Sequence, residues 1–185
     1  MQLTLDKDRG IVSEARQVCS PNCDERPEGC SLDLIVIHSM ALPPGEFGGP
    51  WIDQLFCNCL DPNEHHYFEA IHGLKVSAHF LIRRDGHLVQ YVPINQRAWH
   101  AGKSNYMGRK SCNDFSVGIE LEGDEVTAYT DGQYAMLAEL VNKLQAAYPT
   151  LAEAPIVGHS DIAPGRKTDP GDVFDWRRLE ALLGG

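Results

Sequence analysis

Several features of membrane and secreted proteins are missing from this 185-residue chain. No stretch approaches the roughly 18 consecutive apolar residues that a membrane-spanning helix needs. Nothing near Met1 combines a basic start with an apolar run, as a secretion signal would. Internal repeats and low-complexity tracts are also lacking. We therefore expect a protein that does not bind membranes and stays in the cytoplasm.

Positive charge is also scarce. Lys and Arg number 16 against 26 Asp and Glu, which gives a formal net charge of -10. This balance argues against nucleic acid or an anionic membrane as a partner of the whole surface, and an acidic substrate would have to meet a local cluster of cations. With 43% hydrophobic and 23% charged residues, the composition predicts one domain, residues 1–185, with a substantial core.

The six cysteines, at positions 19, 23, 30, 57, 59 and 112, lack the paired C-x2-C spacing of structural zinc sites. Free thiols in a reducing compartment are the simpler interpretation. The segment SPNCDERPEGC (20–30) reads as an irregular surface stretch, where an incidental disulfide or metal stays open.

What the chain does contain is a loop of turn-forming residues and metal-ligand types, GHSDIAPGRKTDPGD (158–172). Its two Pro-Gly pairs predict tight turns, and a segment that is neither helix nor strand. His159 and Asp169 are residue types that bind zinc, and Arg166 and Lys167 lie between them. A catalytic zinc takes three protein ligands and leaves a position for water. The loop therefore predicts a metal-assisted hydrolase.

A third ligand is expected far upstream. LDLIVIH (32–38) is predicted to be a buried strand with His38 at its carboxyl end, where sites are commonly built. Taken alone, such a histidine can equally be a hydrogen-bonded structural residue, and Asp169 can be a turn residue. Their presence together with His159 favours a metal site.

The remaining segments predict an α/β fold. Residues 39–56 read as a long loop rich in Pro and Gly. The other expected elements are a helix over 61–71 capped by Asp61, a hairpin over 76–92 turning at Asp85-Gly86, a strand over 115–121, a helix over 131–148 capped by Asp131, a strand over 154–157 and a helix over 174–183.

Two carboxylates belong to the 115–121 strand and its continuation. Glu120 and Glu122 are two residues apart, so they point to one face, and one of them is expected to face the site. Glu122 is otherwise expected to be solvent-facing or paired. His79 and His100 stay open between cavity-lining and packed or surface positions, and Trp99 is a candidate cavity wall.

Several blocks in this order resemble the AmpD family, the cytoplasmic zinc-dependent 1,6-anhydro-N-acetylmuramyl-L-alanine amidases of bacterial cell-wall recycling. The blocks are IVIH (35–38), LPPGEFGG (42–49), VSAHFLIRRDG (76–86), RAWHAG (97–102), CNDFSVGIELEG (112–123) and GHSDIAPGRKTDPG (158–171). The resemblance implies a single α/β domain with a mixed central β-sheet flanked by helices, as in the amidase and peptidoglycan recognition protein superfamily. It also implies His38, His159 and Asp169 as Zn²⁺ ligands, Glu120 as the catalytic carboxylate and Lys167 as the cation beside the metal.

The implied reaction is hydrolysis of the amide between the lactyl group of 1,6-anhydro-N-acetylmuramic acid and L-alanine in cytoplasmic muropeptides. No obligatory protein partner is expected. Substrate-binding candidates are Arg166, Trp99, Lys75 and Ser39. Ser39 stands where the family commonly has Asn, so a shorter hydroxyl replaces an amide. Lys75 stands where Arg is expected, which turns a bidentate contact into a point-charge contact.

Two rival functions fit the sequence less well. A non-catalytic peptidoglycan-binding module of the same superfamily would have lost metal ligands, and here all three are present. A secreted amidase acting on intact cell wall would need a signal sequence, and none is visible.

Overall fold

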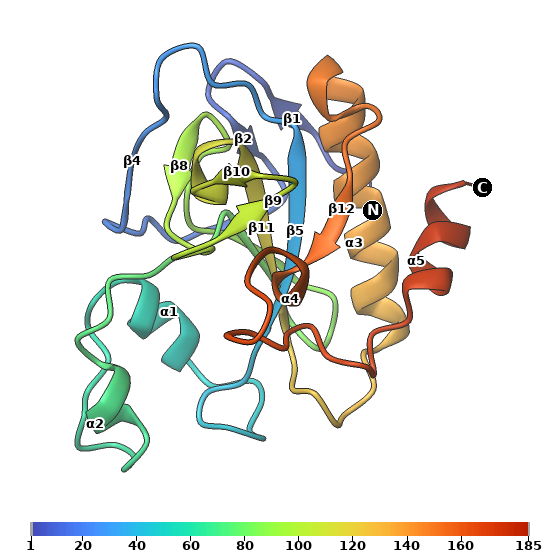
Figure 1. Cartoon of the computed structure of the whole chain (residues 1–185). Coiled ribbons are helices and arrows are strands. Elements are labelled where there is room, and N and C mark those ends of the chain that lie inside the picture. The colour runs from blue at the N-terminus through green and yellow to red at the C-terminus, as the bar shows by residue number, and fades with distance from the viewer. Residues whose placement is uncertain (1, 185) are drawn as a thin grey trace.

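A six-stranded mixed sheet forms the centre of the protein (Figure 1). The computed structural model describes residues 2–184. The sheet order is β12-β5-β11-β6-β7-β3, in which β12, β5, β11 and β6 are parallel and β7 is antiparallel to β6. The strands are β3 (Arg16–Gln17), β5 (Leu34–Met40), β6 (Phe80–Ile82), β7 (Leu88–Gln90), β11 (Ser116–Glu122) and β12 (Ile156–Gly158). The mixed sheet predicted from the sequence is thus confirmed.

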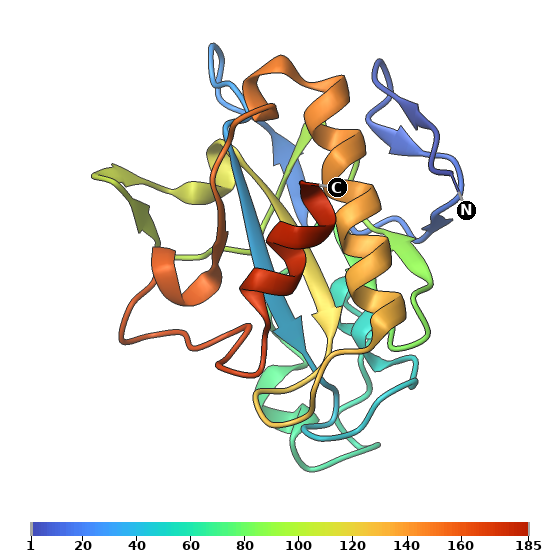
Figure 2. The ribbon, with the colours of Figure 1, turned by 90° about the vertical axis from the view of Figure 1, so that its right-hand side faces the viewer.

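Two helices lie side by side over one face of this sheet (Figure 2). They are α3 (Asp131–Ala147) and α5 (Trp176–Leu183). Thr130, not the predicted Asp131, caps α3: its side chain accepts from the backbone N–H of Gln133, whose side chain in turn accepts from Thr130 N–H. This reciprocal arrangement satisfies two free backbone donors, which explains why the helix starts there.

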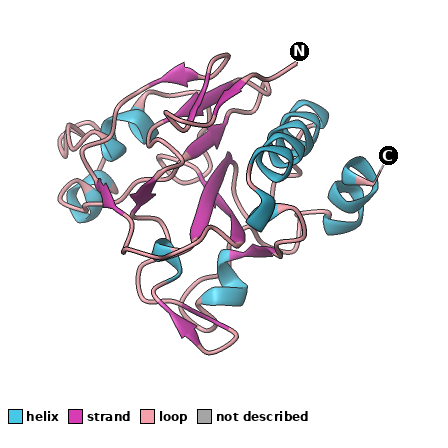
Figure 3. Ribbon diagram, turned by 90° about the horizontal axis from the view of Figure 1, so that it is seen from above, coloured by secondary structure: helices cyan, strands magenta, loops and turns pink. Residues whose placement is uncertain are grey.

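The opposite face is covered by short elements and loops (Figure 3). The helices there are α1 (Trp51–Phe56), α2 (Phe68–Ile71), α4 (His159–Ile162) and the 3-10 turn η1 (Cys112–Asp114), and the paired short strands are β4 (Cys23–Glu25) with β8 (Gln96–Ala98) and β9 (Asn105–Tyr106) with β10 (Arg109–Lys110). Elsewhere β1 (Leu5–Asp6) pairs with β2 (Ile11–Val12), and η2 (Pro149–Leu151) follows α3.

The central strands are buried on both faces, and their side chains alternate. In β5, Ile35 and Ile37 belong to the core under α3, whereas Leu34 and Val36 belong to a cluster on the opposite face. β11 alternates in the same way. Polar side chains that follow at every second position after Leu34 and Val36 therefore point away from α3, toward the loops.

Four local predictions were wrong. The predicted 39–56 loop contains α1, because its apolar residues bury against the sheet. The predicted 61–71 helix is only the four residues of α2, since Asp61 accepts from Asn63 N–H in a turn instead of capping a helix. The 20–30 segment contains β4, which pairs with β8. The 158–172 loop contains the helical turn α4.

The hairpin of β6 and β7 is confirmed, but its turn differs from the prediction. Arg83 N–H donates to the His87 carbonyl, so three residues, not two, form the loop. Gly86 closes it with φ +84°, the left-handed conformation that glycine adopts without strain. Within residues 2–184, no helix has the length and apolar character needed to cross a membrane.

Candidate metal centre and active site

His38 and Glu120 stand level with each other on neighbouring parallel strands. The register pairs Glu120 of β11 with His38 of β5. Both continue the side-chain set that points away from α3, so the imidazole and the carboxyl group share one face. Only 1% of His38 and 6% of Glu120 are exposed. The sheet itself therefore brings together two groups that are 82 positions apart in the chain.

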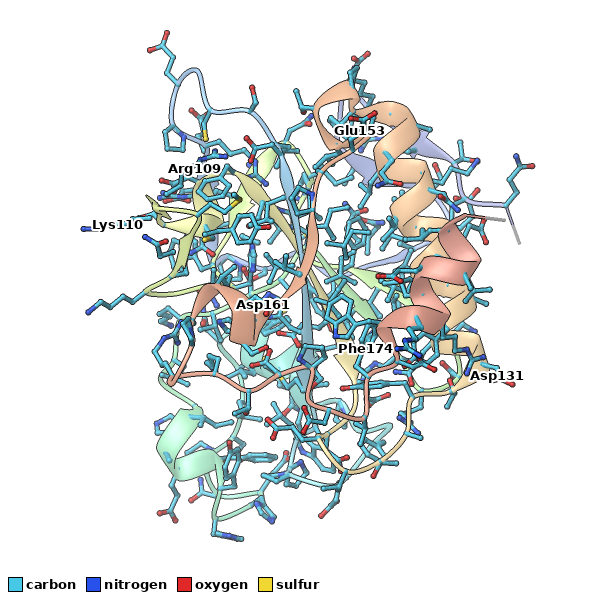
Figure 4. The ribbon with its side chains drawn as sticks, turned by 45° about the vertical axis from the view of Figure 1, so that its right-hand side comes forward. Arg109, Lys110, Asp131, Glu153, Asp161 and Phe174 are labelled. Atoms are coloured by element: carbon cyan, nitrogen blue, oxygen red, sulfur yellow. The ribbon has the colours of Figure 1, made fainter. Side chains whose placement is uncertain are left out.

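β12 delivers the second imidazole. Its last residue, Gly158, is level with Ile37 of β5, so His159 follows directly beside His38. There α4 begins, next to β5 in Figure 1, and Asp161 of that turn accepts from Gly158 N–H at 2.7 Å. Figure 4 shows Glu153 and Asp161 at the two opposite ends of β12. The site thus lies at the carboxyl ends of parallel strands, the usual place for ligands in open α/β sheets.

Asp169 returns to the same point from the end of the loop. Its carbonyl accepts from Ser160 N–H at 3.0 Å, which ties the loop back onto α4. Three ligand atoms then face one another: His38 Nδ1 and His159 Nδ1 are 2.9 Å apart, and Asp169 Oδ2 lies 3.3 and 3.1 Å from them. Tetrahedral zinc with bonds of about 2.0–2.1 Å holds its ligand atoms about 3.3 Å apart. This triangle has the matching size.

The protonation states of His38 and Asp169 also suit a cation. Burial lowers the pKa of His38 to about 4, so the imidazole is neutral at pH 7. Burial opposes ionisation of Asp169, but its contacts with His159 and His38 hold the pKa of that carboxyl well below its usual range. His159 Nε2 faces the Ala101 carbonyl at 3.4 Å, and its Nδ1 faces Asp169 Oδ2 at 3.1 Å. Neutral imidazoles and a carboxylate are the forms that bind zinc.

Glu120 lies beside this triangle with one oxygen free. Its Oε2 is buried and has no hydrogen-bond partner among the described residues. Burial, with the neighbouring charge of Asp169, raises the pKa of Glu120 well above its usual range, and Lys167 opposes this rise. An unpartnered buried carboxyl oxygen is costly, which is typical of a group kept ready for a reactant.

A cleft of about 520 Å³ opens over these groups. Of the predicted site residues, Ser39, Trp99, His100, Glu120, His159, Arg166, Lys167 and Asp169 line it. Arg166 donates to the carbonyls of Ala101 and Lys103, so its guanidinium fastens the loop at the cleft wall. Trp99 donates to Asp24 at 3.1 Å, which fixes the indole. Lys75 is exposed and does not line the cleft, although its neighbours Leu74 and Val76 do.

His100 and His79, whose roles the sequence left open, differ in their distance from the metal ligands: only His100 contacts His38 directly. His100 is buried and contacts His38, with 2.8 Å between His100 Nδ1 and His38 Nε2. His79 lies behind it, where its Nδ1 accepts from Gly118 N–H at 3.0 Å. The sequence reasoning did not identify Ser116, which contacts His100 at 3.1 Å, and no motif singles this residue out.

Comparison with known proteins identifies the family. Residues 28–172 match the N-acetylmuramoyl-L-alanine amidase family. Over 176 residues the chain is 58% identical to the 1,6-anhydro-N-acetylmuramyl-L-alanine amidase AmpD of Citrobacter freundii, an alignment that covers 95% of this chain and 94% of that protein. The chain belongs to the N-acetylmuramoyl-L-alanine amidase family.

Solved structures of this amidase family share the fold. A crystal structure of a selenomethionine AmpD derivative superposes with a TM-score of 0.93 at 57% identity, covering 97% of this chain and 99% of that one. Escherichia coli AmiD, in complex with anhydro-N-acetylmuramic acid-L-Ala-D-gamma-Glu-L-Lys, gives a TM-score of 0.60 at 26% identity, covering 85% and 60%. The amidase fold predicted from the sequence is confirmed.

Acid should destabilise this protein through His79. Burial, with the charge of Arg26, lowers the pKa of His79 to about 3, whereas an unfolded histidine titrates near about 6.5. Between pH 7 and 5, His79 therefore binds a proton in the unfolded chain but stays neutral in the folded protein. We expect this residue to lower the free energy of unfolding by about 2 kcal/mol over that interval.

Urea unfolding with a chelator at pH 7 and pH 5 checks this expectation. His79→Gln keeps an acceptor and a donor but does not titrate, so its free energy of unfolding should fall by about 2 kcal/mol less than that of the wild type. The same pH dependence in both proteins would contradict the assignment.

Proposed function

We propose that this protein is a zinc-dependent amidase of the cytoplasm. Its substrate is a muropeptide, in which it hydrolyses the bond between the lactyl group of 1,6-anhydro-N-acetylmuramic acid and L-alanine. The observation that carries this proposal is the triangle of His38, His159 and Asp169, with ligand atoms 2.9–3.3 Å apart beside the free carboxyl oxygen of Glu120.

These three residues would hold the zinc ion. When bound, zinc supplies Lewis acidity and lowers the pKa of water to about 7. The chain's own part begins with Glu120. The unpartnered Oε2 of Glu120 suits a group that takes a proton from the attacking water and returns it to the leaving amine nitrogen. Glu120 is level with His38 in the sheet register and lines the cleft.

Lys167 would stabilise the charge that develops on the carbonyl oxygen of the scissile amide. It lines the cleft together with Asp169, and it is close enough to Glu120 for its positive charge to oppose the rise in pKa of that carboxyl. A preorganised donor at such an oxygen is worth about 3–4 kcal/mol. The fixed indole of Trp99 offers a flat apolar wall against which a sugar or peptide can pack.

The substrate and the compartment rest on separate observations. The curated relative at 58% identity is named for 1,6-anhydro-N-acetylmuramyl-L-alanine, and AmiD was solved with an anhydro-muropeptide. All six cysteines, which lie within the described residues, are free thiols, which supports a reducing compartment. The net charge of -10 disfavours nucleic acid as a partner, and a muropeptide needs no protein partner for hydrolysis.

Turnover of defined substrates tests the assignment to cell-wall recycling. Purified anhydro-muropeptide should be cleaved at least about tenfold faster than intact cell wall, since about 1.4 kcal/mol of differential transition-state binding suffices for that ratio. A chelator should abolish the cleavage, and added zinc should restore it. Equal rates on both substrates would remove the recycling function, and full activity after zinc removal would remove the metal from the mechanism.

A further inference from the structure

A line of polar groups runs from a backbone carbonyl to the metal ligand His38. Ser116 Oγ lies 2.5 Å from the Cys112 carbonyl oxygen and 3.1 Å from His100 Nε2. His100 Nδ1 in turn lies 2.8 Å from His38 Nε2. Every member is buried: Cys112 and Ser116 are 0% exposed, His100 8% and His38 1%. Solvent therefore does not set the directions of these hydrogen bonds.

The carbonyl at one end fixes the first direction. Two oxygens 2.5 Å apart need a proton between them, and the carbonyl of Cys112 carries none. Ser116 therefore donates to Cys112, which leaves its oxygen as the acceptor for His100. It follows that His100 Nε2 carries a proton and donates it to Ser116.

The next two directions follow from the chemistry of imidazole. His100 is buried, and among the described residues no carboxylate forms a hydrogen bond or ion pair with it. A buried charge without a partner is costly, so the ring is neutral. A neutral ring with its proton on Nε2 has a lone pair on Nδ1. His38 Nε2 must then donate to His100 Nδ1. The lone pair of His38 is thereby left on Nδ1, the atom that faces His159 and Asp169.

The strand β11 is shaped to hold His100 in this place. Ser116, Gly118 and Glu120 are every second residue of β11, so all three lie on the same face of the strand. A Cβ atom at Gly118 would stand 2.4 Å from His100 Cγ, so only glycine lets the ring lie against the strand. The glycine between the serine and the carboxyl group thus makes room for the imidazole that links Ser116 to His38.

We propose that Ser116 is a positioning residue for the metal site: acting through His100, its hydroxyl fixes the tautomer of His38 that presents Nδ1 to zinc. Without the hydroxyl, His100 loses its acceptor for Nε2–H, and its other tautomer directs a proton from Nδ1 at His38. Zinc would then bind only after these protons rearrange. The inference deepens the proposed function and rests on the zinc site that it assigns.

Chelator competition measured with zinc alone tests the role of Ser116. Ser116→Ala should weaken zinc binding by about tenfold, the lower end of the effect of removing a direct hydrogen-bond partner of a ligating histidine, because Ser116 acts through His100. Ser116→Thr keeps the hydroxyl and should restore most of the affinity. Ser20→Ala is the matched control, because Ser20 is also buried and donates to a carbonyl, that of Phe56 at 2.6 Å, away from the histidines.

Nitrogen-15 NMR of the imidazoles gives a second readout that needs no variant to fold. In the wild type, His100 should carry its proton on Nε2 and none on Nδ1, with or without zinc. A proton on Nδ1 of His100, or equal zinc affinity in Ser116→Ala and Ser20→Ala, would overturn the inference while leaving the zinc site intact. A wild-type protein that binds no zinc would remove the proposed function and this role with it.

Discussion

Replacing His159 with alanine is expected to abolish zinc binding and amide cleavage together. Two ligands, His38 and Asp169, would remain at a site that needs three. Loss of a group behind a ligating histidine already costs about 10–100-fold in metal affinity, so loss of the ligand itself should exceed that. The rate on anhydro-muropeptide should fall at least about a thousandfold, because water near pH 7 would no longer be activated. Metal analysis of the purified variant and a turnover assay measure both effects.

Two further variants distinguish the loss of a ligand from the loss of the fold. Asp169→Asn keeps the size of the side chain but removes the anionic ligand, so it should also lose zinc and activity. His66→Ala removes an exposed histidine that does not line the cleft, and it should bind zinc and turn over like the wild type. A His159→Ala protein without zinc that still cleaves the amide would contradict the proposed mechanism.

Glu120→Gln should separate metal binding from chemistry. The three ligands are untouched, so zinc binding should stay close to that of the wild type. The rate should fall by about 10²–10⁴-fold, since an amide cannot take or return the proton. Metal content, chelator competition and single-turnover rates on anhydro-muropeptide give the comparison.

The matched control for this change is Glu153→Gln, which alters an exposed carboxylate at the far end of β12 (Figure 4). It should match the wild type in zinc content and rate. Loss of zinc from Glu120→Gln would assign the carboxyl group to metal binding instead of proton transfer. An unchanged rate with zinc bound would exclude Glu120 from the reaction.

The two carboxylates of β11 differ in their hydrogen bonds, as Glu122 shows. It is only 2% exposed, and its oxygens accept from Arg83 at 3.0 Å, Gly48 N–H at 2.7 Å and Arg84 N–H at 3.1 Å. Of the two expectations for Glu122, pairing is therefore confirmed and solvent exposure is wrong. Its bonds tie the 42–49 loop and the hairpin to β11, whereas the free oxygen belongs to Glu120.

Some local predictions failed where tertiary contacts outweighed sequence signals. Residues 51–56 follow Pro and Gly and read as loop, yet Ile52, Leu55 and Phe56 bury against the sheet and form a helix. Asp131 and Thr130 are both good caps, and the choice fell on Thr130 because Gln133 completes the reciprocal bonds. The burial of residues 51–56 depends on the sheet, which a local pattern does not contain. The Thr130–Gln133 capping box, by contrast, is a local Thr-x-x-Gln pattern that the sequence itself displays.

The sequence alone determined the α/β class, the strand that carries His38, the strand that carries Glu120 and the chemistry of the loop with His159 and Asp169. Apolar periodicity and ligand residue types are local properties, so they can be read along the chain. Tertiary structure alone decided that His38 stands level with Glu120, that β12 ends beside β5, and that Ser116 reaches His38 through His100. Strand order, register and the direction of buried hydrogen bonds exist only once distant segments pair.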